Sequence, residues 1–305
     1  MSEDKNISPD WIAVDWGTTN LRAWAVSKSG RALDMACSSD GMGGLERDQF
    51  ETVLRKSIAC WNLGGSTTVV ACGMVGSRQG WIEAPYTKAP CKPLPDGLIK
   101  APVNGDDLSV YIVPGIRQDN PSDVMRGEET QIAGFIATNP DWDGVICLPG
   151  SHTKWVHISA GEVVSFQTFM TGEMFDTLSQ NTVLRHSIAN EGWDDDAFID
   201  AVSDSMSKPE RIAGRLFSLR ADGLLAGQSA QVARARLSGL LVGAELAAAR
   251  PYWLGQQIAI LGDEKLAKIY SAALLEQGVS AMRTDADHMT VAGLNAAYQS
   301  LKETA

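Results

Sequence analysis

Residues 11–26 read Trp-Ile-Ala-Val-Asp-Trp-Gly-Thr-Thr-Asn-Leu-Arg-Ala-Trp-Ala-Val, and this stretch decides the fold. Apolar residues on both sides of a Gly-Thr-Thr turn predict two strands that form a hairpin. The tip offers hydroxyls and backbone N–H groups, and Gly17 allows a ligand to approach the backbone. We therefore predict that Gly17, Thr18 and Thr19 bind the phosphoryl oxygens of a metal-bound polyphosphate.

Asp15 ends the first strand, where its carboxylate can hold the hydrated Mg²⁺ that favours oxygen ligands. Arg22 lies on the opposite strand face from Leu21 and Ala23, so its guanidinium is predicted to point at the phosphate. The alternative for Asp15 is a plain strand-end turn former. Other nucleotide-binding motifs, Gly-x-x-x-x-Gly-Lys-Ser/Thr and Gly-x-Gly-x-x-Gly, need a helix directly after the glycine loop. Neither pattern occurs before a predicted helix in this sequence. The glycine-rich residues 41–44 are interpreted as a loop.

Composition limits the class of partner. The chain has 305 residues and a formal net charge of −11 at pH 7, and its length predicts two domains. An acidic chain argues against nucleic acid or an anionic membrane as partner, because phosphate groups require a basic surface. The five cysteines are scattered without a C-x-x-C pair, which indicates neither disulfides nor zinc and fits reduced thiols.

Two further features bear on location. The polar start, residues 1–5, lacks signal-peptide character. The apolar helix predicted around Leu240 is too short to span a bilayer and carries Glu245. We therefore expect a cytoplasmic protein without membrane contact, and the sequence leaves a homodimer open.

Residues 144–170 repeat the plan of the first fifty residues. An apolar strand enters a Pro-Gly-Ser turn, a second strand returns with a Trp, and a third strand follows a Gly turn. This duplicated βββ unit predicts two like domains that face a cleft. The second tip predicts further phosphate donors, which are Gly150, Ser151, Thr153 and Lys154. Its alternative is a simple hairpin turn.

Helical periodicity alternates with short strands along the rest of the chain, which predicts α/β architecture. Strands are expected at 11–16, 21–27, 31–37, 67–72, 110–114, 258–261 and 279–283. Helices are expected at 50–61, 128–137, 196–206, 208–220, 228–250 and 266–277, with one more at the end. Residues 89–107 carry four prolines and are predicted to lack regular structure, because proline removes a donor and restricts its predecessor.

The segment Met125-Arg-Gly-Glu-Glu-Thr-Gln131 precedes an apolar helix and places Glu128 and Glu129 in its first turn, where carboxylates are stabilised. The alternative is charge capping alone. The functional interpretation makes one of them the base that accepts a proton from a substrate hydroxyl during phosphoryl transfer. Because Arg126 lies beside them, a substrate carboxylate can be held there.

Residues 69–81 form a predicted buried strand that ends in a glycine-rich loop, and open α/β sheets bind ligands at the carboxyl ends of strands. The predicted contacts to sugar hydroxyls or a carboxylate come from Gly76, Ser77, Arg78, Trp81 and Tyr86. The alternative for Trp81 is packing in the core.

The order of these parts is similar to that in the sugar-kinase, actin and heat-shock ATPase superfamily. In carbohydrate kinases of that group a Gly-Asp helix start before the second hairpin supplies the base, and Gly127-Glu128 occupies the matching place. The resemblance thus implies Glu128 as first choice and Glu129 as second. It also implies that Gly262 and Asp263 contact adenosine, where many of these kinases have Gly-Gly.

More narrowly, several segments resemble 2-dehydro-3-deoxygalactonokinases. They are Gly73-Met-Val-Gly-Ser-x-x-Gly-Trp81, Val124-Met-Arg-Gly-Glu-Glu-Thr-Gln131, Pro149-Gly-Ser-His-Thr-Lys-Trp155, Met170-Thr-Gly-Glu173 and Ser238-Gly-Leu-Leu-Val-Gly-Ala-Glu245. The resemblance implies duplicated ribonuclease H-like domains of the actin-like ATPase type, each a mixed sheet with flanking helices, around an interdomain cleft. It implies phosphorylation of 2-keto-3-deoxygalactonate by ATP and Mg²⁺ at the terminal hydroxyl, in galactonate catabolism.

We expect an N-terminal sugar-binding and first-phosphate domain over residues 1–127. A C-terminal nucleotide-binding domain is expected over 128–305, with a last helix able to pack back near the boundary. Two alternative functions stay open. One is a kinase for another sugar acid or an amino sugar, which a substrate panel would distinguish. The other is a non-catalytic, actin-like ATP-binding sensor, in which Glu128 would have no catalytic role.

Overall fold

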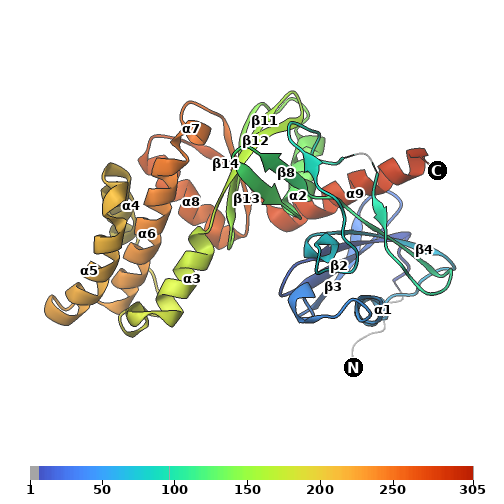
Figure 1. Ribbon diagram of the computed structural model, residues 1–305, viewed down its shortest axis with the longest axis horizontal. Coiled ribbons are helices and arrows are strands. Elements are labelled where there is room, and N and C mark those ends of the chain that lie inside the picture. The colour runs from blue at the N-terminus through green and yellow to red at the C-terminus, as the bar shows by residue number, and fades with distance from the viewer. Residues whose placement is uncertain (1–6, 96, 305) are drawn as a thin grey trace. The chain divides into compact units, whose positions relative to one another are not determined.

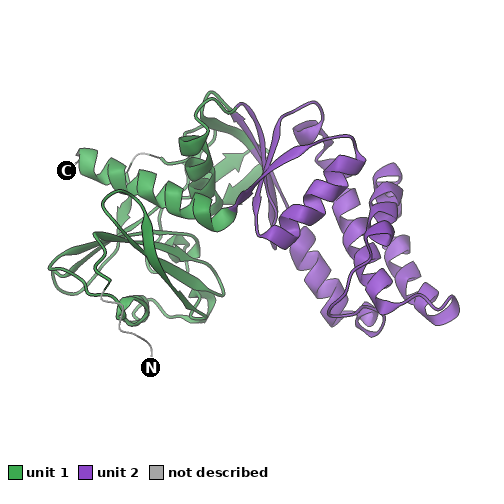
Figure 2. Ribbon diagram, turned by 180° about the vertical axis from the view of Figure 1, so that it is seen from behind, with its two compact units in different colours: residues 1–142, 159–165, 286–305 green, residues 143–158, 166–285 purple. Residues whose placement is uncertain are grey.

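The computed structural model describes residues 7–95 and 97–304, so the polar start at residues 1–5 lies outside the described part. The chain forms two compact units, shown in Figure 2, and each is described by itself. Unit 1 comprises residues 1–142, 159–165 and 286–305, and unit 2 comprises residues 143–158 and 166–285. The predicted division of roles at residue 127 and the cleft between the domains stay predictions.

Unit 1 is built on a six-stranded sheet (Figure 1). In spatial order its strands are β3 (Ala32–Ser38), β2 (Leu21–Val26), β1 (Trp11–Trp16), β4 (Thr67–Cys72), β7 (Leu108–Ile112) and β6 (Ile99–Lys100). The predicted hairpin forms, because β1 pairs antiparallel with β2, and β1 also pairs parallel with β4. Alternate residues of β1 enter two different hydrophobic clusters, since the side chains of a strand point to opposite faces.

The second sheet has five strands. Their order is β12 (Glu162–Phe169), β11 (Thr153–Ser159), β10 (Gly144–Leu148), β13 (Ile258–Gly262) and β14 (Ala281–Asp285). As in the first sheet, the central strand β10 has an antiparallel neighbour, β11, on one side and a parallel neighbour, β13, on the other. The predicted duplication is therefore confirmed, and both sheets have the ribonuclease H-like strand order.

Helices flank both sheets. Those of unit 1 are α1 (Phe50–Ile58), α2 (Glu128–Thr138) and α9 (Ala286–Thr304). Those of unit 2 are α3 (Thr171–Asn181), α4 (Asp195–Ser207), α5 (Ile212–Leu225), α6 (Ala230–Ala248), α7 (Arg250–Trp253) and α8 (Glu264–Glu276). In unit 1, α1 and α9 contribute to different core clusters, and Tyr298 of α9 stacks on Trp11 with ring centroids 4.4 Å apart. In unit 2, α6 packs against α3, α4 and α5 (Figure 1).

Some elements differ from the prediction. Residues 89–107 are not wholly irregular, because the two-residue strand β6 pairs with β7 between the prolines. Residues 41–44 contain a 3-10 turn, η1 (Met42–Gly44), rather than a plain loop. The helix α3 and a small sheet were not predicted; its strands are β5 (Thr87–Lys88), β8 (Ile116–Asp119) and β9 (Ser122–Met125). Within the described ranges, no helix combines the length and hydropathy needed to cross a membrane.

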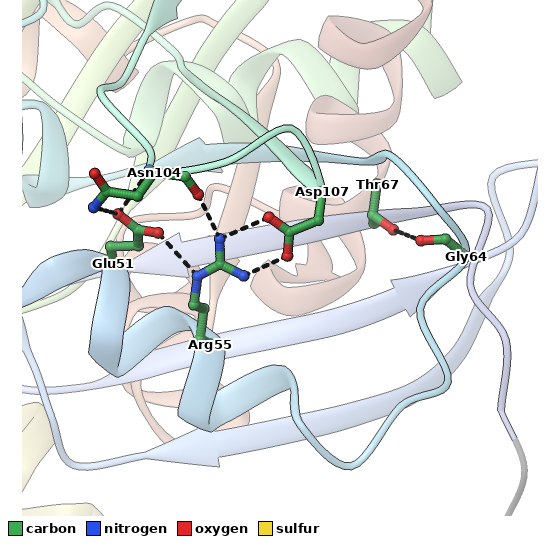
Figure 3. Close-up of polar contacts among 6 residues, drawn as sticks. All are labelled: Glu51, Arg55, Gly64, Thr67, Asn104 and Asp107. Carbon is green, nitrogen blue, oxygen red and sulfur yellow. Dashed lines mark hydrogen bonds and ion pairs between the residues drawn. The ribbon is translucent and has the colours of Figure 1, made fainter.

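A polar network ties α1 to the loop before β7 (Figure 3). The Arg55 guanidinium donates to Glu51 Oε1 at 2.9 Å and makes two bonds to the Asp107 carboxylate, at 2.6 and 2.9 Å. The second Glu51 oxygen accepts from the backbone and side-chain nitrogens of Asn104. This paired geometry holds the helix against the sheet edge by a fork-like contact, which is the stronger kind of exposed ion pair.

The helices α2 and α9 touch through two glycines. A Cβ atom at Gly134 would lie 2.0 Å from the carbonyl oxygen of Met289. A Cβ atom at Gly293 would lie 1.9 Å from the carbonyl oxygen of Thr130. The two backbones therefore meet only because neither position carries a side chain. This contact fixes α2, the helix whose first turn carries the two predicted candidates for the base.

We predict that Gly134→Ala lowers the free energy of unfolding by about 3 kcal/mol, because the added methyl overpacks a backbone contact. The measurement is urea unfolding followed by circular dichroism. Gly214→Ala is the matched control, since a Cβ at this glycine of α5 meets nothing within 4 Å. That change is expected to stabilise the protein by roughly 0.5 to 1 kcal/mol. Equal effects of the two substitutions would contradict the account of the helix contact.

Candidate functional site

The first hairpin presents an open tip. The Gly17 amide donates to the Asn20 carbonyl at 2.9 Å, which closes the turn, and two amides of η1 donate to the carbonyls of Gly17 and Thr18. Among the described residues, no hydrogen bond is made by the Thr18 or Thr19 amide, and both side chains are exposed. A Cβ at Gly17 would approach nothing closer than 3.6 Å. Packing among the described residues thus does not require a glycine at this position.

Asp15 and Arg22 form a cross-strand pair in this hairpin. Arg22 Nη2 donates to Asp15 Oδ2 at 2.5 Å, and Arg22 Nη1 pairs with a carboxylate oxygen of Asp287 in α9. The Cys72 thiol lies 3.8 Å from Asp15 Oδ1. Burial raises the pKa of Asp15; the Arg22 guanidinium opposes the rise, and the carboxylates of Asp287 and Glu128 add to it. Sequence reasoning missed Asp287, because it is 265 positions from Arg22 and belongs to no recognisable motif.

Three segments meet at the end of β1. Gly73 follows β4 with φ of +91°, and a Cβ there would lie 2.7 Å from the Trp16 carbonyl oxygen and 3.2 Å from Asp15 Oδ1. A Cβ at Gly127 would lie 3.3 Å from the Gly73 Cα. The turn after β4 therefore lies close to both the end of β1 and the start of α2. As a result, Asp15 and Glu128, which the sequence treats as separate motifs, share one site.

The structure distinguishes the two neighbouring glutamates. Glu128 is partly exposed, and its Oε2 accepts from the Arg126 amide at 3.0 Å. Glu129 has no exposed surface. Its Oε2 accepts from the Gly127 amide at 2.6 Å, and its Oε1 accepts from the Thr130 hydroxyl at 3.0 Å. Burial, reinforced by the Glu128 carboxylate, raises the pKa of Glu129 to about 7.

Four of the predicted substrate residues lie together. Arg126 is buried; its Nη2 donates to the Ala84 carbonyl at 2.7 Å, and its guanidinium lies over the Tyr86 ring, 4.2 Å from the centroid. A Cβ at Gly76 would lie 2.9 Å from Arg126 Nη1, so the absence of a side chain makes room for the guanidinium. In the described chain, neither Arg126 Nη1 nor the buried Ser77 hydroxyl has a hydrogen-bond partner. Among the residues that the structure describes, no carboxylate side chain forms an ion pair with this buried cation.

The other two predicted substrate residues lie elsewhere in the loop. The Arg78 side chain is 79% exposed and stands 3.6 Å from a Glu83 carboxylate oxygen. Trp81 is buried in an aromatic cluster with Trp16 and Phe50, which is the alternative that the sequence left open for it.

The second hairpin borders a cavity of about 970 Å³ within unit 2. Gly150, Ser151 and Asp263 line it, and Gly262 lies beside Pro149 at the base of the tip. The predicted second phosphate tip and the predicted adenosine residues are thus brought together. Thr153 and Lys154 are buried; the Thr153 hydroxyl bonds to the Tyr270 hydroxyl at 2.8 Å and so points into unit 2.

Aromatic and cationic side chains complete this cavity, and sequence reasoning missed them. Phe175 and Trp193 line it together with Arg234, whose guanidinium lies 5.0 Å from the centroid of the Phe175 ring. These residues lie on α3, on the loop before α4 and on α6. No local pattern links them, because only the packing of the helices gathers them in one place.

The donor set of unit 1 fits a magnesium ion that is bound jointly with phosphates. The described residues hold no cluster of three or more His, Cys, Asp or Glu side chains arranged to hold a metal ion. Mg²⁺ needs no such cluster, because it usually binds through one or two carboxylates together with substrate phosphates. Asp15 supplies hard oxygen atoms, and Asp287 and Glu128 leave the surroundings of Arg22 with an excess of negative charge.

Comparison with known proteins gives a consistent result. The sequence profile of a family described as 2-keto-3-deoxy-galactonokinase matches residues 15–297. A probable 2-dehydro-3-deoxygalactonokinase of Rhizobium meliloti is 37% identical over 297 residues, which are 95% of this chain and 97% of that protein. The 2-dehydro-3-deoxygalactonokinase of Escherichia coli K12 is 33% identical over 287 residues, 93% and 96% of the two chains.

A solved structure agrees. The crystal structure of a Sinorhizobium meliloti protein assigned to the same enzyme class has a TM-score of 0.89 and 37% sequence identity to this chain. The match covers 95% of this chain and 96% of that one. The likeness therefore spans nearly the whole chain and is not confined to short motifs.

The raised pKa of Glu129 predicts a pH-dependent stability. The folded protein keeps the proton up to about pH 7, whereas the unfolded chain releases it near the ordinary value of 4.5. The contribution of this group to the free energy of unfolding therefore falls as pH rises from 4.5 to 7, and the loss is then complete. Glu129→Gln removes the ionisable group, so its stability relative to the unmodified protein should rise between pH 5.5 and pH 8 by about 2 kcal/mol.

Urea unfolding of both proteins at the two pH values checks this. Glu264→Gln is the control, because Glu264 is exposed and pairs with Lys268, which lowers its pKa. Removing the Glu264 carboxylate should not raise the free energy of unfolding at pH 8. If the stability of Glu129→Gln relative to the unmodified protein does not rise between pH 5.5 and pH 8, the pKa of Glu129 is not raised in the folded protein.

Proposed function

This chain belongs to the 2-keto-3-deoxy-galactonokinase family, and we propose that it transfers the γ-phosphate of ATP to 2-dehydro-3-deoxy-D-galactonate. The product is the 6-phosphate, formed during galactonate catabolism. The observation that carries this proposal is the identity of 37% and 33% to two relatives of that name over more than nine tenths of the chain. The enzyme is a phosphotransferase with an alcohol acceptor, and ATP is its phosphate donor.

The first hairpin is proposed to bind the transferred phosphate. The amides and hydroxyls of Thr18 and Thr19 are available as donors, and Gly17 leaves room for phosphoryl oxygens. Arg22 supplies positive charge beside them. Asp15 would hold Mg²⁺, and the ion would neutralise phosphate charge. Because the transition state of phosphoryl transfer is loose, this positioning and charge compensation should contribute more than proton removal.

Glu128 is proposed as the base that accepts the proton of the substrate's terminal hydroxyl. It is supported by its partial exposure, by its place near Asp15, and by the Arg126 amide, which orients one carboxylate oxygen. Glu129 suits this role less well, because its side chain is fully buried and both its oxygens accept local hydrogen bonds. Glu129 instead stabilises the start of α2.

Arg126 is proposed to bind the carboxylate of the sugar acid. A buried guanidinium without a carboxylate partner is unfavourable by itself, and a bound anion offsets that cost. The Ser77 hydroxyl and Tyr86 are proposed to complete this subsite, and Gly76 gives the guanidinium its space. Arg78 and Trp81 support the loop, the first from the surface and the second from the core.

The cavity of unit 2 is proposed to bind the nucleotide. Gly150 and Ser151 would contact phosphates, with Lys154 behind the tip, and Gly262 and Asp263 would lie beside the adenosine. A Cβ at Gly150 would meet nothing within 4 Å, so this tip also has room for a ligand. Thr153 is proposed to support the tip, because its buried hydroxyl already bonds to Tyr270.

The partners of the reaction are small molecules, the sugar acid and ATP. We propose that the enzyme works in the cytoplasm, where both occur together. The homodimer that the sequence leaves open stays a prediction.

Exchanging each glutamate for glutamine tests the assignment of the base. Glu128→Gln is expected to lower kcat by roughly 100-fold to 10,000-fold, because the transferred proton loses its acceptor. Glu129→Gln should lower kcat far less than Glu128→Gln does. The measurement is the rate of ADP release with 2-keto-3-deoxygalactonate as substrate, followed by a coupled dehydrogenase assay. Loss of turnover confined to Glu129→Gln would reverse the two roles.

Arg126→Met tests the carboxylate subsite. The KM for 2-keto-3-deoxygalactonate is expected to rise by about 100-fold, since a buried ionic contact is lost, while the KM for ATP stays unchanged. The variant should be at least as resistant to heat as the original, because an unpaired buried charge is removed.

Arg117→Met is the control for this test, since Arg117 is exposed on β8 and pairs with Asp119. A parallel assay of the gluconate epimer and of neutral sugars defines the acceptor. If Arg126→Met leaves the KM of the keto acid unchanged, the carboxylate binds elsewhere. If no acceptor stimulates ADP release by the original protein, the proposed activity is wrong.

A further inference from the structure

The motif Ser238-Gly-Leu-Leu-Val-Gly-Ala-Glu245 ends in a carboxylate that the proposed reaction does not use. Glu245 lies on α6 and is only 3% exposed. Its Oε1 accepts from the Trp155 indole at 2.8 Å. Its Oε2 accepts from the Tyr270 hydroxyl at 2.8 Å and from the Thr171 hydroxyl. One buried side chain thus links α6 to β11, α3 and α8.

The partners of Glu245 lead directly to the second hairpin. Thr153, the first residue of β11 after the tip, bonds to the same Tyr270 hydroxyl. Thr171 begins α3, and this helix packs on the tip: a Cβ at Gly172 would lie 2.3 Å from the Gly150 carbonyl oxygen, and the Glu173 amide donates to the Ser151 carbonyl at 2.9 Å. Glu245 therefore holds both the strand that leaves the tip and the helix that braces it.

The carboxylate also sets the direction of this hydrogen-bond chain. Above about pH 7 the carboxylate is ionised and only accepts hydrogen bonds, so the Tyr270 hydroxyl donates to Glu245. The Tyr270 oxygen is then free to accept, and the Thr153 hydroxyl donates to it. An apolar residue would fill the same space, and burial, which raises the pKa of Glu245 to about 7, makes the charged form costly. Packing alone does not explain a glutamate at this position.

We propose that Glu245 is a positioning residue for ATP, which fixes the second hairpin so that Gly150 and Ser151 meet the phosphates in the cavity they line with Thr171 and Tyr270. This inference rests on the proposed function, because it requires that the cavity takes the nucleotide. Glu245 acts through Tyr270, Thr171 and Trp155 and does not touch the nucleotide itself.

Two substitutions test the proposal. Tyr270→Phe keeps the buried ring and removes only the hydroxyl that joins Glu245 to Thr153. Glu245→Gln keeps the shape and removes the charge that orders the donors. Both are expected to weaken ATP binding by about tenfold, the effect of losing a hydrogen bond to a charged group. The Kd of ATP is measured by calorimetry with Mg²⁺ at pH 8, where Glu245 is ionised, and the KM of the keto acid should not change.

Ser205→Ala is the matched control. Ser205 is buried in the same unit and donates to the Leu240 carbonyl at 2.7 Å, but this bond does not involve the hairpin. It should lower the Tm and leave the Kd of ATP unchanged. If Tyr270→Phe and Glu245→Gln lower the Tm but bind ATP as tightly as the original, Glu245 is purely structural and the inference is wrong.

The inference can fail separately from the proposed function. If the original protein does not bind ATP in the calorimeter, the proposed function fails first. If Glu245→Gln does not fold, Tyr270→Phe alone decides. This variant removes no charge, and the Glu245 carboxylate keeps its hydrogen bonds from Trp155 and Thr171.

Discussion

Side chains are absent at Gly73 and Gly127, and this absence lets the turn after β4 and the start of α2 meet at the end of β1. The contact of α2 with α9 depends on the same kind of constraint, because the two backbones touch at Gly134 and Gly293. Without these approaches, Glu128 would stand away from Asp15. The geometry of the proposed phosphate site in unit 1 thus depends on glycines that let backbone segments approach, and these contacts place the acidic groups.

Two arginines supply positive charge at the proposed site of an otherwise acidic protein. The protein carries a net charge of −11, but the proposed ligands are anions. Arg22 is shared between two carboxylates, whereas the buried Arg126 pairs with none in the described part of the chain. The two arginines therefore differ in availability: Arg22 is already paired within the protein, and the carboxylate of the substrate is the proposed counter-ion of Arg126. This contrast supports a phosphate and metal role for the first and an acid-binding role for the second.

Much of the fold could be predicted from the sequence, since strands with a period of two and a repeated Gly-hydroxyl turn are local signals. The hairpin at residues 11–26 and the duplication are such cases. The helix α3 was not predicted, because its sequence is mostly polar and begins with Thr-Gly, although Met174, Phe175 and Leu178 stand at helical spacing. The inward direction of the Thr153 hydroxyl depends on Tyr270, more than a hundred residues away. The pairing of Arg22 with Asp287 likewise arises only when α9 packs against the first sheet, and no pattern announces it.

Burial of two carboxyls has a consequence for calorimetry. Glu129 and Glu245 both keep their protons to about pH 7 in the folded protein. At pH 6 the unfolded chain has lost them, so unfolding releases nearly two protons, on the order of one from each group. The heat absorbed on melting then includes the heat of protonating the buffer. Phosphate and imidazole, which both buffer near this pH and differ strongly in that heat, should therefore report different apparent enthalpies for the same transition.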